Sequence, residues 1–255
     1  TAFNGLDVKT ALLSISKISE ALYGIEVTNQ QFIDDVLIEL DGTDNKARLG
    51  SNATIAVSIA AAQAAAKYEC KPLWRYLAKN NQNVFLPLPE IQIFGGGAHA
   101  SNRVDIQDFM IIPIGANDYA EALDWAAGVY QTAKLIMEEK GLLCGVADEG
   151  GFWPNFTSNE EALEFLMRSI ERAGFTPGQD ISISLDIAAT QFGKNGVYNL
   201  LRDKLKVDSD LLSEIFLKWI EKYPIVSFED PFAEDDIVAL TKFTKAIGSR
   251  VQIVA

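Results

Sequence analysis

The order of apolar and polar positions predicts short strands alternating with amphipathic helices over most of the chain. From residue 119 to 140 apolar residues recur every three or four positions, and Gly141 ends the pattern, as expected for a helix. Further helices are predicted from Ser158, which with Glu161 forms a capping box, to Gly174, from Ser209 onwards, and over 235–247. Short apolar runs predict strands at 91–94, 109–114, 144–147, 181–185, 225–228 and 251–254. This alternation implies right-handed crossovers and a parallel sheet, in either a barrel or an open doubly wound fold.

The first third of the chain reads as helices only. Asp41-Gly-Thr-Asp-Asn predicts a turn, and Ser51-Asn52 is expected to cap an Ala-rich helix over 53–68. Two prolines within Val84-Phe-Leu-Pro-Leu-Pro bar a helix there and mark a boundary. We therefore predict a helical domain over residues 1–84 and an α/β domain over residues 85–255.

Carboxylates stand where several apolar runs stop. Asp148 and Glu149 follow the run at 144–147, Asp186 follows 181–185, and Glu229 follows 225–228. The carboxyl ends of barrel strands are where barrel enzymes keep their chemistry. Mg²⁺ prefers carboxylate oxygens and retained water, and buried acids without a cation would be costly. Asp186 and Glu229 are therefore candidate metal ligands, with solvated acidic ends as the alternative.

Two glycine-rich segments accompany these acids. Gly95-Gly-Gly-Ala-His99 joins the first two predicted strands of the α/β domain and carries the chain's only histidine. Its glycines allow close backbone approach to a ligand, although a simple turn would also explain them. Asp148-Glu149-Gly-Gly places two acids on a tight turn, where one could be desolvated and kept protonated as a general acid. Gln107 and Asp108 open the second strand, where an aspartate is most often a solvated end or cap.

Composition narrows the functional class. A net charge of −13 argues against a nucleic-acid-binding surface, and it would repel an anionic substrate unless metal ions reverse the sign locally. No apolar stretch is long enough to span a membrane. Cys70 and Cys144 are too few for a disulfide framework; we expect reduced thiols in the core, which suits a cytoplasmic protein.

Six motifs, taken in order, resemble those of the enolase (phosphopyruvate hydratase) family in its bacterial form. They run through almost the whole chain: Leu40-Asp-Gly-Thr-Asp-Asn-Lys-Ala-Arg-Leu-Gly-Ser-Asn-Ala53, Gly96-Gly-Ala-His-Ala, Val104-Asp-Ile-Gln-Asp-Phe-Met110, Asp148-Glu-Gly-Gly-Phe-x-Pro-Asn155, Leu185-Asp-Ile-Ala-Ala189 and Tyr223-Pro-Ile-Val-Ser-Phe-Glu-Asp-Pro-Phe232. The resemblance implies an N-terminal capping domain followed by an enolase-type β/α (TIM-like) barrel. It also implies a glycolytic lyase that dehydrates 2-phosphoglycerate reversibly to phosphoenolpyruvate with Mg²⁺.

The resemblance assigns roles to particular positions. Glu149 matches the glutamate that assists departure of the hydroxyl, and His99 matches a histidine of the mobile loop near the substrate. Asp186 and Glu229 match two of three metal-binding carboxylates. Gln107 and Asp108 match the Gln-Glu pair that lines the pocket. The resemblance also implies a phosphorylated hydroxy acid as substrate and a homo-oligomer, usually a dimer.

The sequence departs from the family pattern at several of these motifs. Asp108 stands where a Glu is usual, Gln92 and Gly95 each replace an Asn, and Ala147 and Ala255 each replace a Gly. By the resemblance, the third metal ligand, the catalytic lysine and the phosphate-binding Arg and Ser lie beyond Ala255. The family's N-terminal strands and serine loop would precede residue 1. We therefore expect an internal portion of an enolase, inactive on its own, with part of the barrel.

Two other functions remain open at this point. One is an enolase-like paralogue acting on a related phosphorylated or phosphono hydroxy acid, motivated by the changes at Asp108, Gly95 and Ala147. The other is a non-catalytic interaction protein that uses the barrel surface. A metal titration would separate the second from an enzyme, because a binding module has no reason to keep Asp186 and Glu229 as Mg²⁺ ligands.

Overall fold

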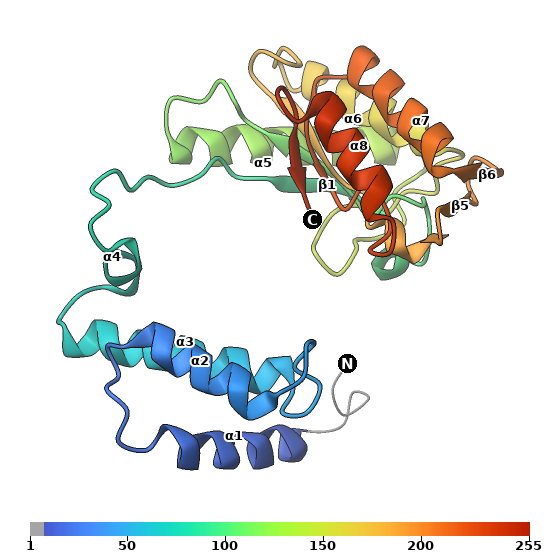
Figure 1. Ribbon diagram of the computed structural model, residues 1–255. Coiled ribbons are helices and arrows are strands. Elements are labelled where there is room, and N and C mark those ends of the chain that lie inside the picture. Colours follow the sequence, from blue (N-terminus) through green and yellow to red (C-terminus); the bar gives the residue numbers. More distant parts are fainter. Residues whose placement is uncertain (1–7) are drawn as a thin grey trace. The chain divides into compact units, whose positions relative to one another are not determined.

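The computed structural model describes residues 8–255, which form two compact units that divide between Phe85 and Leu86 (Figure 1). The first seven residues of the expected helical domain lie outside the described part. The first unit consists of α1 (Val8–Leu22), α2 (Gln30–Asp41), α3 (Ser51–Tyr68) and the short α4 (Leu73–Ala78). Apolar side chains from the first three helices and the loop before α3 form its core: Ile18, Ile33, Leu37, Leu49 and Ala53.

The turn after α2 forms as the sequence predicts. Gly42 takes a left-handed conformation with φ of 68°, and the buried Asp41 carboxylate accepts hydrogen bonds from the backbone of Leu49, at 2.7 Å, and of Thr43. The prediction for the next helix is off by two residues. Gly50 is the N-cap, so Ser51 already lies in the first turn of α3.

The second unit is built on a five-stranded sheet in the order β1-β2-β3-β7-β8 (Figure 1). Its strands are β1 (Ile91–Gly95), β2 (Asp108–Ile112), β3 (Ser182–Asp186), β7 (Ile225–Glu229) and β8 (Gln252–Val254). Within residues 8–255 this sheet does not close, which agrees with the expectation of a partial barrel.

The sheet is only partly parallel, contrary to prediction. β3, β7 and β8 are parallel, but β2 runs antiparallel to both β1 and β3. The reason lies in the connection between β1 and β2. A parallel crossover usually runs through an α-helix, whereas residues 96–107 contain only a single 3₁₀ turn, η2 (Ala98–Ala100). The chain therefore turns back beside β1.

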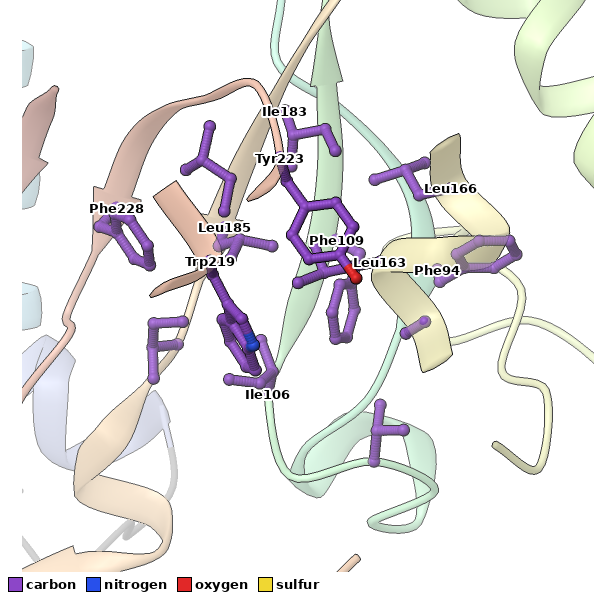
Figure 2. Close-up of a cluster of buried hydrophobic side chains, with 14 of the residues drawn as sticks. Phe94, Ile106, Phe109, Leu163, Leu166, Ile183, Leu185, Trp219, Tyr223 and Phe228 are labelled. Carbon is purple, nitrogen blue, oxygen red and sulfur yellow. The ribbon is translucent and has the colours of Figure 1, made fainter. Parts of the chain in front are cut away.

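Helices cover one face of this sheet and bury its apolar side chains. They are α5 (Tyr119–Lys140), α6 (Asn159–Arg172), α7 (Ser209–Lys222) and α8 (Ile237–Ile247). Figure 2 shows Leu163 and Leu166 of α6 and Trp219 of α7 gathered with Ile183 and Leu185 of β3. Because side chains alternate along a strand, Ser182, Ser184 and Asp186 of β3 lie on the opposite face. That polar face carries the site described below.

The strand predicted at 144–147 does not form. Val146 makes only an isolated antiparallel bridge with Phe152, while Phe152 pairs in turn with Phe94 of β1. The four residues between Ala147 and Phe152 fold back as a turn, in which the backbone N–H of Ala147 donates to the carbonyl of Gly151 at 2.7 Å. A segment that reverses direction so soon cannot extend into a neighbouring strand.

The cysteine prediction is also partly wrong. Cys70 and Cys144 are free thiols, as expected, but both are exposed rather than in the core. Cys70 lies just after α3 with φ of 53°, and Cys144 lies in the irregular segment before the turn. Loss of the predicted strand accounts for the exposure of Cys144.

A small antiparallel sheet inserted between β3 and α7 was not predicted. It comprises β4 (Gly193–Lys194), β5 (Val197–Leu200) and β6 (Leu205–Asp208). Asn195 and Gly196 connect the first two strands with φ of 51° and 71°. An Asn-Gly pair is the strongest short-range signal for a tight hairpin turn, so this element was readable from the sequence.

Candidate active site

Three carboxylates lie in one row across neighbouring strands. Strand register pairs Gly95 of β1 with Asp108 of β2, Asp108 with Asp186 of β3, and Asp186 with Glu229 of β7. β2 runs opposite to its neighbours, so its first residue meets their carboxyl ends. The row therefore combines Asp186 and Glu229, expected at strand ends, with Asp108, which opens a strand.

Burial and mutual repulsion destabilise the charged forms of these acids. Burial, reinforced by the negative charges of Glu229 and Asp108, raises the pKa of the Asp186 carboxyl to about 7. Burial and the charge of Asp230 likewise raise the pKa of Glu229. Burial also raises the pKa of Asp108, although a hydrogen bond from Gln107 works in the opposite direction. Three carboxylates that repel one another form a site that favours a cation.

His99 lies between the row and the Asp148–Gly151 turn. Its Nε2 atom is 3.3 Å from Oδ1 of Asp108, and its Nδ1 atom is 3.9 Å from Oε1 of Glu149. His99 lies in η2, next to the glycine segment 95–97, whose close packing requires glycine. A β-carbon on Gly96 would lie 2.2 Å from the carbonyl oxygen of Ile106. The glycine loop therefore brings the histidine against both Asp108 and Glu149.

The acidic turn itself is solvent-accessible. The Glu149 side chain is 58% exposed, against 4% for Asp108, and Asp148 is exposed as well. The expected desolvation of an acid in this turn is therefore not seen in the described residues. The deeply buried carboxylate is that of Asp108.

Amide side chains hold the carboxylates in place. Nε2 of Gln107 donates to Oδ2 of Asp186 at 2.8 Å and to Oδ2 of Asp108 at 3.3 Å. Nε2 of Gln191 donates to Oε1 of Gln107 at 2.5 Å, and its Oε1 accepts from the backbone of Ala98 at 2.8 Å. Gln191 lies in the 3₁₀ turn η3 (Ala189–Gln191) and was missed in the sequence, where no local motif marks it.

The donors suit a hard divalent cation. Asp186 and Glu229 are adjacent carboxylates, and no lysine or arginine among residues 8–255 forms an ion pair with the row. His99, Asp108 and Glu149 form a second group, whose ligand atoms all lie within 4.8 Å of one another. Oxygen-rich donors favour Mg²⁺ or Mn²⁺, whereas the imidazole of the second group also suits softer metals.

This unit has a sheet with carboxylates in a row at one end of its strands, and helices packed on one face of the sheet. That is the architecture of a β/α-barrel enzyme. Residues 83–255 match the family model described as "Enolase, C-terminal TIM barrel domain", and residues 1–77 match "Enolase, N-terminal domain". The chain therefore belongs to the enolase family, whose enzymes are lyases and generally metal-dependent. No helix in the described part is both long and apolar enough to cross a membrane.

Proposed function

We propose that this chain is part of an enzyme that dehydrates 2-phosphoglycerate reversibly to phosphoenolpyruvate with Mg²⁺. The observation that carries the proposal is the row of Asp108, Asp186 and Glu229, whose carboxylates are placed together without a lysine or arginine partner in residues 8–255. A phosphorylated hydroxy acid is itself anionic, and this row would repel it. A bound divalent cation would balance the charge of the carboxylates and would also attract the anionic substrate.

In this proposal Asp186 and Glu229 hold the metal. Bound Mg²⁺ would neutralise the charge that develops on the substrate carboxylate as the neighbouring proton leaves. The hydrogen bonds from Gln107 and from the backbone N–H of Ala188, at 2.8 and 2.9 Å, fix both oxygens of Asp186. Hydrogen-bonded supports of this kind orient ligands and raise metal affinity.

Glu149 and His99 act at the hydroxyl group. The hydroxyl leaves as water, so it needs a proton donor, and Glu149 stands on a turn within 3.9 Å of the imidazole. His99 lies between Glu149 and Asp108. In this proposal it orients the acid and contacts the substrate. Gln107 and Asp108 line the pocket. The family resemblance assigns removal of the carbon-bound proton to a lysine, and we identify no residue in this role here.

One pair of sequence departures supports 2-phosphoglycerate over a shifted substrate. A β-carbon on Gly95 would lie 2.6 Å from the β-carbon of Ala147. These two positions therefore share one space, which only one of them can fill. The change from Asn to Gly at 95 and from Gly to Ala at 147 is then a compensated exchange, and needs no new substrate to explain it.

Homo-oligomer formation, a cytoplasmic location and a glycolytic role stay predictions. The oligomer and the glycolytic role come from the family resemblance, and the cytoplasmic location comes from the small number of cysteines. Light scattering of the full-length protein tests the first.

Variants of the full-length protein test the proposed activity. Phosphoenolpyruvate formation from 2-phosphoglycerate would be followed with excess Mg²⁺ in the wild type, in Asp186→Asn, in Glu149→Gln and in Asp210→Asn. Asp210 is a matched control, because its side chain is 82% exposed on α7. Loss of the proton donor in Glu149→Gln should lower kcat about 10²–10⁴-fold. Asp186→Asn should lose Mg²⁺-dependent turnover, and the control should retain it. A wild type that releases no phosphoenolpyruvate would refute the proposal.

A further inference from the structure

A glutamine on β1 links the two sides of the candidate site. The Gln92 carboxamide donates a hydrogen bond from Nε2 to Oδ1 of Asp108. Its Oε1 accepts one from the backbone N–H of Gly151 at 2.6 Å. One side chain thus bonds both the buried end of the carboxylate row and the turn that carries Glu149.

Strand register explains how Gln92 reaches Asp108. Gln92 pairs with Met110 across the antiparallel ladder, and Met110 and Asp108 lie two residues apart on the same face of β2. Gln92 and Asp108 are therefore diagonal neighbours, a separation that a long side chain can span. A bulge between Gln92 and Phe94 shifts the register on the side toward Asp108.

Two neighbouring glycines make room for this side chain. A β-carbon on Gly151 would lie 2.6 Å from Oε1 of Gln92, and one on Gly95 would lie 3.2 Å from its Nε2. The turn itself is closed by the 2.9 Å hydrogen bond from Gly150 to the carbonyl of Ala147. At Gly151, therefore, the Gln92 side chain of the sheet is hydrogen-bonded to the backbone of the turn that carries Glu149.

We infer that Gln92 is a positioning residue that fixes the distance between Asp108 and the Glu149 turn. Without its carboxamide, Oδ1 of Asp108 would lose a donor and Gly151 would lose its acceptor. Both groups that face His99 would then be less constrained, although Gln92 itself need not touch the substrate. This inference rests on the proposed function only for its effect on turnover; the structural link stands independently of the substrate.

The lengths of the two side chains provide a sharp test. Gln92 has one methylene more than Asn, and Asp108 has one fewer than Glu, so the Asn-Glu pair usual in the family has the same summed length. Gln92→Asn alone should be too short to bond both partners. Combining it with Asp108→Glu should restore the hydrogen bond between positions 92 and 108, because the longer carboxylate makes up the missing methylene.

The first arm of the experiment is kinetic, on the full-length protein with 2-phosphoglycerate. Gln92→Met keeps the chain length but removes both polar atoms, and it should lower kcat about 10–100-fold, the range for lost supporting contacts. The KM should change much less, since substrate-binding groups remain. Gln92→Asn should behave similarly, and the Gln92→Asn/Asp108→Glu double variant should recover the part of the loss that comes from the bond between positions 92 and 108. Gln131→Met, at an exposed position on α5, is the control.

The second arm is amide hydrogen exchange, which needs no activity. Gln92→Met should speed exchange in the peptide covering 145–153 while leaving peptides from β7 and α7 unchanged; a general loss of stability would affect all of them. If the wild type has no turnover, the proposed function fails, yet the exchange arm still decides the inference. Unchanged exchange at 145–153 in Gln92→Met overturns it. So does a double variant that is no more active than Gln92→Asn in an active enzyme.

Discussion

Gly95 and Ala147 occupy one shared space beside the carboxylate row, since a β-carbon on Gly95 would lie 2.6 Å from that of Ala147. Both residues are buried, Gly95 at the end of β1 and Ala147 at the start of the acidic turn. Gly95 does not need a positive φ, so backbone conformation does not require a glycine there. The neighbouring methyl group of Ala147 does. Packing between these two residues sets how closely the Glu149 turn approaches the sheet.

A reciprocal exchange tests this packing. Gly95→Ala should destabilise the protein by about 1–3 kcal/mol, as overpacking does in well-packed interiors. Adding Ala147→Gly removes the opposing methyl and should recover most of that loss. Denaturant unfolding of the two single variants and the double variant gives the coupling directly. Additive effects of the two substitutions would show that the positions do not compete for space.

Removing one charge from the row should have opposite effects with and without metal. In chelator-treated protein, Glu229→Gln relieves repulsion from its acidic neighbours and should raise the free energy of unfolding by roughly 0.5–1 kcal/mol. With Mg²⁺ at a hundred times its dissociation constant, the wild type should gain about 2.7 kcal/mol, and the variant should lose most of this gain.

Thermal melts with Mg²⁺ and with chelator measure both effects. Glu221→Gln, an exposed position on α7, serves as the control. A wild type whose melting temperature ignores Mg²⁺ would count against a metal site at the row.

A buried asparagine is expected to hold the segment that leads into the site. Asn159 is fully buried; its Nδ2 donates to Asp105 at 2.9 Å, and its Oδ1 accepts from the backbone of Asp105 at 2.9 Å and of Ile106 at 3.3 Å. Asn159→Ala would leave the backbone N–H groups of Asp105 and Ile106 without this acceptor, and it should cost about 2–4 kcal/mol. Chemical denaturation measures this change in the free energy of unfolding. A decrease below about 0.5 kcal/mol, the size of an ordinary surface effect, would contradict this role for Asn159.

Asp236 should make a pH-dependent contribution to stability. Burial alone would raise its pKa, but hydrogen bonds from Ser209 and Tyr198 outweigh burial, so the pKa lies below the ordinary 3.8. A lowered pKa stabilises the folded state above the unfolded value, and the contribution is lost as the pH falls through the folded value. The stability difference between wild type and Asp236→Asn should therefore be constant above about pH 5 and shrink below 3.8. A stability difference that grows as the pH falls would contradict the lowered pKa of Asp236.

The sequence predicted the elements with strong local signals. The helix over 119–140 forms with those bounds, because its apolar period is regular and Gly141 adopts φ of 66° as its C-cap. The strand ends carrying Asp186 and Glu229 were also located correctly. Strand direction was not predicted: a parallel sheet was expected, although the sequence indicates no helix between β1 and β2 that could form a crossover. The run at 144–147 was mistaken for a strand because its apolar residues line a turn.

Much of the candidate site depends on contacts that the sequence does not encode locally. Asp108 joins the row only because β2 is antiparallel, and Gln191 reaches Gln107 from a distant 3₁₀ turn. Gln92 was noticed only as a departure from a family pattern; its contacts with Asp108 and Gly151 require the sheet register. Side-chain contacts between distant segments follow from the packed fold, not from periodicity.

A metal-restoration assay on the full-length wild-type protein tests whether the carboxylate row holds a catalytic metal. The protein would be stripped with chelator, supplied with 2-phosphoglycerate, and titrated with Mg²⁺ while phosphoenolpyruvate is measured. We expect no turnover without metal and saturable recovery with Mg²⁺, lost in Asp186→Asn but kept in Asp210→Asn. Turnover that persists after complete removal of metal, or that is equally strong in Asp186→Asn, would contradict a catalytic metal held by the carboxylate row.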